Sequence, residues 1–376
     1  MEIIPCSWLS LRPGSRSIAL AAKLVLLLLA GGAPAARASG FHNEDFGVRR
    51  MGMFTVVARP DDGTTVFHNP AGLTLCPETC FYHSQSWFYA SLGLRLYDSE
   101  GRLRPEHEIS PDWNIGFLPF FGVISALGTE SLRLGLSLYA PNAYGASLPD
   151  DEPTRYHATG ALFVSSRATL SAAWAVSPRL SLGANLSLVH NYLTMSRIFN
   201  LAVLEQPDRR FDPPEQTRAG DGTLDLEGSS WSHAWDVGVL LHPTERLRLG
   251  AAFFSGSPVE LEGDVVLKYQ DGSEERTRQH TLLVIPFTLR AGVNWEPSPR
   301  FELGADIRYY HYQVFQEQRT TFDRPLKGQT GLVDAKSYDN AWNWSVGVLY
   351  RPLEGLELMG GYQEDYTPIP TATFTR

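Results

Sequence analysis

The chain has 376 residues, of which 43% are hydrophobic and 19% are charged, and its formal net charge is −9. This acidic balance provides no basic stripe, so we expect no nucleic-acid partner. Beyond the first 40 residues no run reaches the ~18 apolar residues of a membrane-spanning helix, which excludes such a helix from the mature chain.

Residues 1–38 have the composition of a secretory signal peptide. The apolar run Leu24–Ala30 is too short to span a bilayer, follows several basic residues and leads to Ala36-Arg37-Ala38. A basic start, a short apolar centre and small residues at the end form a cleaved export signal. We therefore predict cleavage before Ser39.

Residues 39–80 do not alternate between polar and apolar side chains as a strand does. The segment contains the pair Asp61-Asp62 and the tetrapeptide Asn69-Pro70-Ala71-Gly72. On its own this tetrapeptide is a good turn, because proline fixes φ, asparagine caps and glycine takes a left-handed conformation. His68, beside it, is expected to be an ordinary contact within the segment.

Two cysteines remain in the mature chain, Cys76 and Cys80, because Cys6 lies in the signal peptide. Their even number and export to an oxidising compartment favour a local disulfide, with two free thiols as the alternative. A metal site is disfavoured because no second Cys or His pair stands at ligand spacing nearby. Haem attachment is disfavoured because Phe81, and not His, follows Cys80. We expect no metal and no other cofactor.

Residues 81–376 are built from a repeated hairpin. A short polar turn is followed five times by an apolar residue, a polar residue, Leu and Gly, about every 50 to 65 residues. The copies are Leu132-Arg133-Leu134-Gly135, Leu180-Ser181-Leu182-Gly183, Leu247-Arg248-Leu249-Gly250, Phe301-Glu302-Leu303-Gly304 and the looser Leu356-Glu357-Leu358-Met359-Gly360. This rhythm predicts an up-and-down antiparallel β-barrel with short turns at one end and long loops at the other.

Alternation along the strands indicates which face meets lipid. From Leu283 to Glu296 the odd positions are apolar, and Phe301–Tyr310 and Trp342–Tyr350 repeat the pattern. A soluble sandwich alternates too. However, several runs exceed the ~9 residues with which a tilted strand crosses a bilayer, and aromatic residues gather at strand ends. We therefore predict an all-β transmembrane barrel, monomeric and surrounded by lipid, in a bacterial outer membrane.

Two breaks in the strand pattern, Asn200 to Ser229 and Asp323 to Asn340, are predicted to be long loops. They form either an entrance for a ligand or plain surface decoration. Arg133 and Arg248 lie close to short turns and are predicted to be charges at the periplasmic rim.

Charged residues also fall on the wet face of the strands. If the turn Pro297-Ser298-Pro299 sets the register, Arg290 lies about opposite Asp306, with Arg308 nearby. We interpret these side chains as a structural ion pair in a polar lumen. The alternative is that they bind the carboxylate of a ligand.

The chain resembles the FadL/TodX family of outer-membrane transporters for long-chain fatty acids and other hydrophobic molecules, from Phe41 to its end. The matching elements are Asp61-Asp62 with Asn69-Pro70-Ala71-Gly72-Leu73, then Gly135-Leu136-Ser137-Leu138-Tyr139-Ala140-Pro141, and Gly360-Gly361-Tyr362 with Pro368-Ile369-Pro370. The tetrapeptide between a signal peptide and a barrel pattern is the most specific of them.

The resemblance implies a mechanism. Residues 39–80 would be a hatch inside the barrel of residues 81–376, with Asn69, Pro70, Ala71 and Gly72 shaping its gate. Ligand would enter between the long loops, lie in an apolar luminal site, and leave sideways through movement of the hatch and a kinked early strand. The residues that we assign to ligand binding in the lumen are Arg290, Arg308 and Phe67.

The number of strands differs from that of the family. We count about eleven strands before Arg376, whereas the family has fourteen and closes its first strand, here near Phe81–Tyr97, against its last. We therefore expect a chain whose last strands, about three, are missing. The alternative is a smaller closed barrel.

The sequence thus predicts passive uptake of long-chain fatty acids or similar hydrophobic molecules. The alternatives are a transporter of aromatic hydrocarbons and an outer-membrane surface or receptor barrel without transport. We predict no enzyme, because His190 has no serine partner identifiable by motif and Ser165-Ser166 has no nearby histidine of matching parity.

Overall fold

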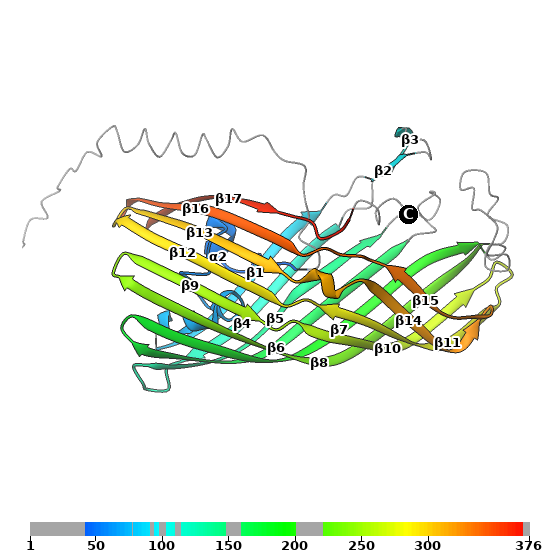
Figure 1. The fold of residues 1–376 in the computed structure, drawn as a ribbon, viewed down its shortest axis with the longest axis horizontal. Helices are drawn as coiled ribbons and strands as arrows, with labels where there is room; N and C mark the ends of the chain where they lie inside the picture. Colours follow the sequence, from blue (N-terminus) through cyan, green and yellow to red (C-terminus); the bar gives the residue numbers. More distant parts are fainter. Residues whose placement is uncertain are drawn as a thin grey trace, which may run out of the picture.

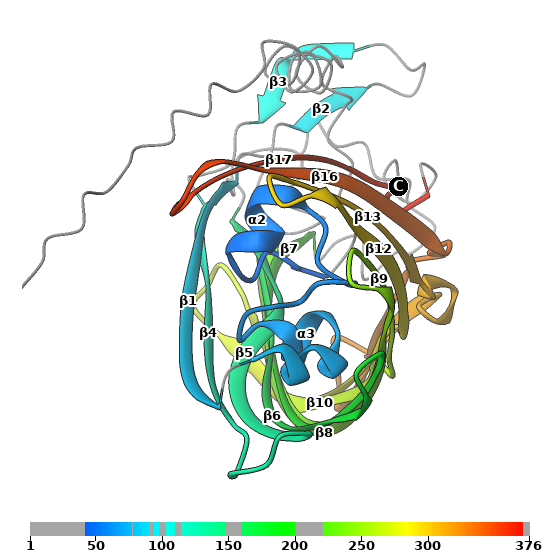
Figure 2. The same ribbon diagram turned by 90° about the vertical axis from the view of Figure 1, so that its left-hand side faces the viewer.

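The computed structural model describes residues 42–76, 78–90, 94–97, 103–109, 114–147, 159–200 and 221–370. The predicted signal peptide, residues 1–38, lies outside them. A curved antiparallel sheet surrounds a short helical segment, as Figure 2 shows along the barrel. Short turns connect the strands at one end, the turn end, at the left of Figure 1; the opposite end is here called the loop end.

The described part of the chain forms one sheet of fifteen strands and a separate hairpin of two strands, β2 (Leu94–Tyr97) and β3 (Leu103–Ile109). The sheet strands are β1 (Thr79–Ala90), β4 (Asn114–Ser125), β5 (Leu132–Ser147), β6 (Gly160–Ser177), β7 (Leu180–Asn200), β8 (Asp221–Thr244), β9 (Leu247–Phe254), β10 (Ser257–Lys268), β11 (Glu274–Ile285), β12 (Thr288–Ser298), β13 (Phe301–Tyr310), β14 (Glu317–Leu326), β15 (Gln329–Ala335), β16 (Ala341–Leu353) and β17 (Leu356–Asp365).

Eleven of these strands pair in one continuous order, β1-β4-β5-β6-β7-β8-β9-β12-β13-β16-β17, which matches the predicted count of about eleven. β10, β11, β14 and β15 extend the wall at the loop end. Among the described residues β1 pairs with β4 alone and β17 with β16 alone, so no ladder joins the two edges. The predicted absence of further strands stays a prediction.

One predicted loop is largely strand, and the described end of the other is strand as well. Residues 221–229 belong to β8, and residues 201–220 lie outside the described part. The break predicted at 323–340 contains the end of β14, a turn with left-handed Lys327 and Gly328, and β15. These strands were not predicted because their outward residues are polar or charged, so the sequence lacks the apolar outer stripe that marks the other strands.

The outer face of most strands is apolar. Exposed side chains there include Leu186 and Leu188 on β7, Trp231 and Trp235 on β8, Leu289 and Trp295 on β12, and Trp342 and Trp344 on β16. Their inward neighbours are polar and buried, for example Asn185, Asp236, Arg290 and Asn343. The predicted alternation of a lipid-facing and a polar luminal side therefore holds for this part of the wall.

The alternation reverses toward the loop end. Leu289 and Trp295 of β12 point outward, but Leu283 and Ile285, also at odd positions, are buried inside. The single strand predicted from Leu283 to Glu296 is therefore wrong: it breaks at Pro286-Phe287, and β11 presents its other face. Proline cannot donate to the ladder, and the facing Gly256, at a φ of 68°, lies so close that a side chain there would overlap Ile285 and Pro286.

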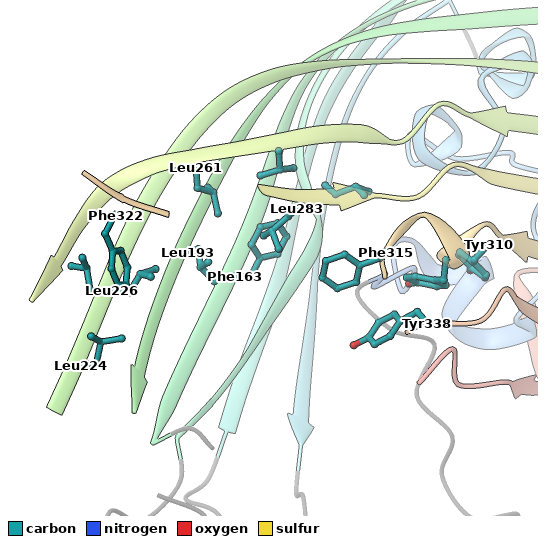
Figure 3. Close-up of a cluster of buried hydrophobic side chains, with 14 of the residues drawn as sticks. Phe163, Leu193, Leu224, Leu226, Leu261, Leu283, Tyr310, Phe315, Phe322 and Tyr338 are labelled. Carbon is teal, nitrogen blue, oxygen red and sulfur yellow. The ribbon is translucent and has the colours of Figure 1, made fainter. Parts of the chain in front are cut away.

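At the loop end the lumen is consequently apolar and the outside charged. Figure 3 shows side chains from several strands projecting inward, and together they form the luminal apolar cluster. Its buried members are Phe163, Leu193, Leu224, Leu226, Val259, Leu261, Val265, Leu267, Leu283, Ile285, Tyr310, Tyr312, Phe315, Phe322, Leu326, Tyr338 and Ala341. Outside, Arg278 lies 3.6 Å from Glu262 and His280 lies 3.1 Å from Asp323.

The helical segment inside the barrel lies toward the turn end. It contains α2 (Val48–Met53), α3 (Thr65–His68) and the 3₁₀ helix η1 (Pro70–Leu75), as the blue ribbons of Figure 2 show. Within the described ranges no helix is both long enough and apolar enough to cross a membrane.

Glycines on the inner wall let this segment approach the strands. A side chain built at Gly250 would lie 2.7 Å from the carbonyl carbon of Val57, and one at Gly361 would lie 2.6 Å from that of Met53. Six of the described wall glycines that face this segment are here called the glycine girdle: Gly183, Gly238, Gly250, Gly304, Gly347 and Gly361. Gly183, Gly250 and Gly304 are three of the five glycines that end the repeated hairpin phrase, so close approach of the helical segment explains the glycine in these three copies.

Candidate functional site

The Asn69-Pro70-Ala71-Gly72 motif is buried against two paired glycines of the girdle. Gly183 of β7 and Gly238 of β8 are register partners, and the backbone at Pro70-Ala71 and the side-chain oxygen of Asn69 press against them. The amide of Asn69 donates to the carbonyl oxygen of Val57 at 2.9 Å and to that of Val239, in the wall, at 3.1 Å. Asn69 therefore connects two parts of the hatch to the barrel.

A charged cluster anchors the hatch near the turn end. Glu302 of β13 is fully buried and accepts hydrogen bonds from Arg49 and Arg59 of the hatch. Asn294 donates to it at 2.7 Å and Arg351 at 3.3 Å. In this Glu302 cluster the wall supplies the carboxylate, and the cations come both from the hatch, as Arg49 and Arg59, and from the wall, as Arg351.

A second cluster, the Glu44 cluster, has the opposite polarity. Glu44 of the hatch lies 3.0 Å from Arg290 of β12 and 2.9 Å from Arg308 of β13. Arg50 of α2 approaches the same carboxylate at 3.7 Å, and Tyr310 donates its hydroxyl hydrogen to it at 2.5 Å. Burial opposes the charge on Glu44, but the three guanidinium groups outweigh it and lower the pKa of Glu44.

The predicted pairing of Arg290 with Asp306 is wrong. Arg290 is the register partner of Arg308, and Asp306 faces Gly292, because the strands pair two residues away from the assumed register. Asp306 instead accepts from the backbone N–H groups of Val56 and Val57 at 2.7 and 3.1 Å, and it pairs with Arg308 at 3.2 Å. The wall arginines thus share hatch and wall carboxylates.

Phe67 lies inside the hatch and not in the luminal apolar cluster. Its ring packs against Phe46, Tyr139 and Phe254, and the guanidinium of Arg290 stacks on it at 4.6 Å from the ring centre. Its carbonyl oxygen accepts a hydrogen bond from Arg290 at 2.8 Å. Phe67 therefore positions Arg290. Its predicted contact with a ligand is not supported by this placement.

His68 and the two arginines expected at the rim are structural contacts. His68 shares a hydrogen bond of 2.8 Å with the carbonyl oxygen of Phe46, as expected for a contact within the hatch. Arg133 donates to the carbonyl oxygens of Thr129 and Glu130 in a short turn. Arg248 pairs with Glu296 at 2.6 Å.

The wall is irregular where the hatch begins. On β5 the register with β6 shifts between Tyr139 and Asn142, so Ala140 and Pro141 bulge out of the ladder. The N–H of Asn43 donates to the carbonyl oxygen of Pro141 at 2.9 Å. The residue next to Glu44 therefore covers this bulge.

Cys76 and Cys80 are free thiols in the structure, so the disulfide favoured by the sequence is not formed. The buried Sγ of Cys76 points toward the carbonyl oxygen of Asp62, 4.0 Å away in the hatch. Burial, and then the nearby Cys80 thiol, raise the pKa of Cys76 to about 12. Within the described ranges no three His, Cys, Asp or Glu side chains gather as metal ligands would.

Comparison with known proteins decides the family. Residues 29–375 match the family described as "Outer membrane protein transport protein (OMPP1/FadL/TodX)". The chain belongs to the FadL/TodX family. Its fold is therefore that of an outer-membrane β-barrel, and its place is the bacterial outer membrane.

Relatives of this FadL/TodX protein are distant in sequence. A putative outer membrane protein of Neisseria meningitidis serogroup B is 21% identical over 395 residues, covering 94% of this chain and 82% of the relative. A Pseudomonas aeruginosa FadL homologue superposes with a TM-score of 0.73 at 19% identity, over 89% of this chain and 83% of that one. The Ralstonia pickettii toluene transporter TbuX gives 0.67 at 16%, over 85% and 86%. These structural likenesses concern the fold alone.

Two features of this FadL/TodX protein escaped the sequence analysis. Glu44 stands in a segment without a pattern, so nothing marked it as the centre of a cluster. The luminal apolar cluster was hidden by the reversal at Pro286-Phe287, although the charged outward positions of β10 and β11 were a signal that could have revealed it.

Proposed function

We propose that this FadL/TodX protein lets long-chain fatty acids or similar hydrophobic molecules cross the outer membrane passively, as a monomer. Membership of a family of outer-membrane transporters of hydrophobic compounds supports this function. The observation that carries it is the luminal apolar cluster, which lies at the loop end and is followed by a polar, hydrogen-bonded hatch.

Removal of apolar surface from water favours entry of the cargo. Each CH₂ group that leaves water for an apolar surrounding gains roughly 0.8 kcal/mol, so an acyl chain prefers this lumen to the hydrated layer outside. The hatch then separates the apolar lumen from the periplasm. Movement of the hatch around Asn69 and Pro70, together with the bulge at Pro141, would give the cargo a path sideways into lipid.

The proposal is tested by adjacent substitutions on one strand. Leu283 is 9% exposed and faces the lumen, whereas Leu282 is 50% exposed on the outer face. Leu283→Asn would put an amide against the cargo, at a cost of about 1–3 kcal/mol, and should weaken binding of oleate about 5- to 150-fold. Leu282→Asn is the matched control and should bind as the wild type does. Equal affinities of the two variants would contradict the proposal.

The gating role proposed for the hatch motif needs an uptake assay. Asn69→Ala with Pro70→Ala removes the bonds to Val57 and Val239 and should change uptake of labelled oleate while outer-membrane abundance stays near normal. Unchanged uptake would reduce the motif to a turn. Loss of uptake in proportion to loss of protein would assign it to folding.

A transporter of aromatic hydrocarbons is the second candidate. The structures of TbuX and TodX are described as those of toluene transporters, and they share this fold. Purification in a detergent unlike lipid, followed by mass spectrometry of bound apolar molecules, separates the candidates by the identity of the ligand. A surface or receptor barrel would carry no such ligand and would show no uptake.

A further inference from the structure

The carboxylate of Glu44 lies at the boundary between the hatch and the apolar lumen. Tyr310, which donates to Glu44, is itself a member of the luminal apolar cluster. The ring of His42 packs on Tyr310 at 5.2 Å and on Tyr312 at 6.4 Å between ring centres. The apolar surroundings of a hydrocarbon chain and the arginines that hold a carboxylate therefore adjoin at Tyr310.

The Glu44 cluster has hydrogen-bond donors that it does not use. In the described part of the chain, Nε of Arg290 and Nη1 of Arg308 are buried and have no hydrogen-bond partner. Both ring nitrogens of His42 are in the same state. Buried guanidinium N–H groups without acceptors are costly, so the site favours a carboxylate placed where its oxygens reach these unused donors as well.

The charged groups of the Glu44 cluster come from two parts of the protein, and this decides which of them a ligand can replace. Arg290 and Arg308 belong to the wall, whereas Glu44 belongs to the hatch and stands next to Asn43, which covers the bulge at Pro141. Replacement of Glu44 by another carboxylate keeps both wall arginines paired, so no unpaired charge is buried in the exchange. In the Glu302 cluster the carboxylate itself belongs to the wall, so movement of the hatch does not withdraw it from Arg351, the wall arginine beside it.

We propose that Glu44 occupies the place of the carboxylate of an amphiphilic cargo, and that a cargo with a long apolar chain displaces Glu44 from Arg290 and Arg308. Displacement frees the start of the hatch and uncovers the bulge at Pro141. A neutral molecule of the same shape fills the apolar lumen but leaves Glu44 in place. This inference rests on the proposed function and adds a requirement for a carboxylate in the release step.

The test compares oleate with oleyl alcohol on the full-length protein in lipid nanodiscs. Affinity is measured for the wild type and for Glu44→Gln, which keeps the size of the side chain and removes its charge. Glu44→Gln should bind oleate at least tenfold more tightly and oleyl alcohol as the wild type does. Glu302→Gln also weakens the anchoring of the hatch, and it should leave the ratio of the two affinities unchanged.

Hydrogen exchange reports release of the hatch. In the wild type, oleate should speed exchange of the Asn43 and Phe46 amides at least tenfold, and oleyl alcohol should not. In Glu44→Gln these amides should exchange fast without ligand. Heat-dependent gel mobility confirms that each variant is a folded barrel.

Each outcome bears on one of the two proposals. Equal acceleration of exchange by oleate and oleyl alcohol, or an unchanged affinity ratio in Glu44→Gln, would overturn the exchange at Glu44 and leave transport intact. Failure of both ligands to bind the wild type would overturn the proposed function and this inference with it.

Discussion

If the glycine girdle holds the hatch closed, substitutions at two adjacent glycines should differ in their effect on the hatch. Gly361 and Gly360 are neighbours on β17, but a methyl group at Gly361 would lie 2.6 Å from the carbonyl carbon of Met53, whereas one at Gly360 would meet no atom within 4 Å. Gly361→Ala should therefore push the hatch off the wall, and Gly360→Ala should not.

The magnitude follows from the overlap. The added carbon would sit roughly 1 Å inside ordinary contact with the backbone of α2, which has no flexible end to move aside, and overpacking of this kind costs about 1–3 kcal/mol. Since 1.4 kcal/mol is a factor of about ten, the open hatch should become about 5 to 150 times more populated. Gly360→Ala should be neutral or stabilising by about 0.4–1 kcal/mol, because alanine restricts the unfolded chain.

Native-state hydrogen exchange measures both effects. The amides of Val56 and Val57 donate to Asp306 and report closure of the hatch. Their exchange should accelerate by the factor above in Gly361→Ala and not in Gly360→Ala, while amides of β7 and β8 stay protected in both. Equal protection of the hatch in the two variants would show that the contact with Met53 does not hold it, and would refute the reasoning.

Three further predictions concern charge, membrane position and pH. Glu302→Gln removes the carboxylate that Arg49 and Arg59 share and should destabilise the closed hatch by about 3 kcal/mol, seen as faster exchange in α2; a change under about 0.5 kcal/mol would contradict the cluster. Leu289→Arg, on the lipid-facing wall, should lower the unfolding free energy in urea by about 2–4 kcal/mol, and Leu282→Arg, on the charged outer wall, by less than about 1 kcal/mol; similar losses would move the membrane boundary. Burial lowers the pKa of His42 to about 3. His42 therefore stays neutral in the closed hatch, whereas in the open hatch it takes up a proton below pH ~6.5, which favours opening. Between pH 7.5 and 5 the population of the open hatch should rise about thirtyfold through His42, as measured by exchange rates divided by the intrinsic amide rate at each pH, and a profile unchanged by His42→Gln would exclude this group.

The fold was largely predictable because its signals are local. Alternation along β12, β13 and β16 and the hairpin phrases before Gly183, Gly250 and Gly304 predicted the wall, its outer face and its turns. The reason for the glycines was not predictable, since it depends on hatch backbone more than 50 residues away in sequence. The reversal at Pro286-Phe287 was not predicted either. The apolar residues keep to odd positions through the break, so the alternation does not show that they point into the lumen before it and toward lipid after it.

The site was predictable only by residue type. Arg290 and Arg308 were expected in the lumen from parity, and the structure places both there. Their partner Glu44 was not identified, because the register between neighbouring strands predicts only contacts between two wall residues. Residue spacing in the sequence does not reveal a contact between the wall and a segment that lies in the lumen.

The reversed wall at the loop end also determines what drives the proposed cargo. Transfer from water to the apolar lumen lowers the free energy of an acyl chain by roughly 0.8 kcal/mol per CH₂, but the next transfer, from lumen to bilayer, joins two hydrocarbon-like surroundings and releases almost nothing. The protein therefore lowers a barrier without setting a direction. Inward flux lasts only while reactions inside the cell consume the molecule, and a membrane saturated with it would return it by the same path.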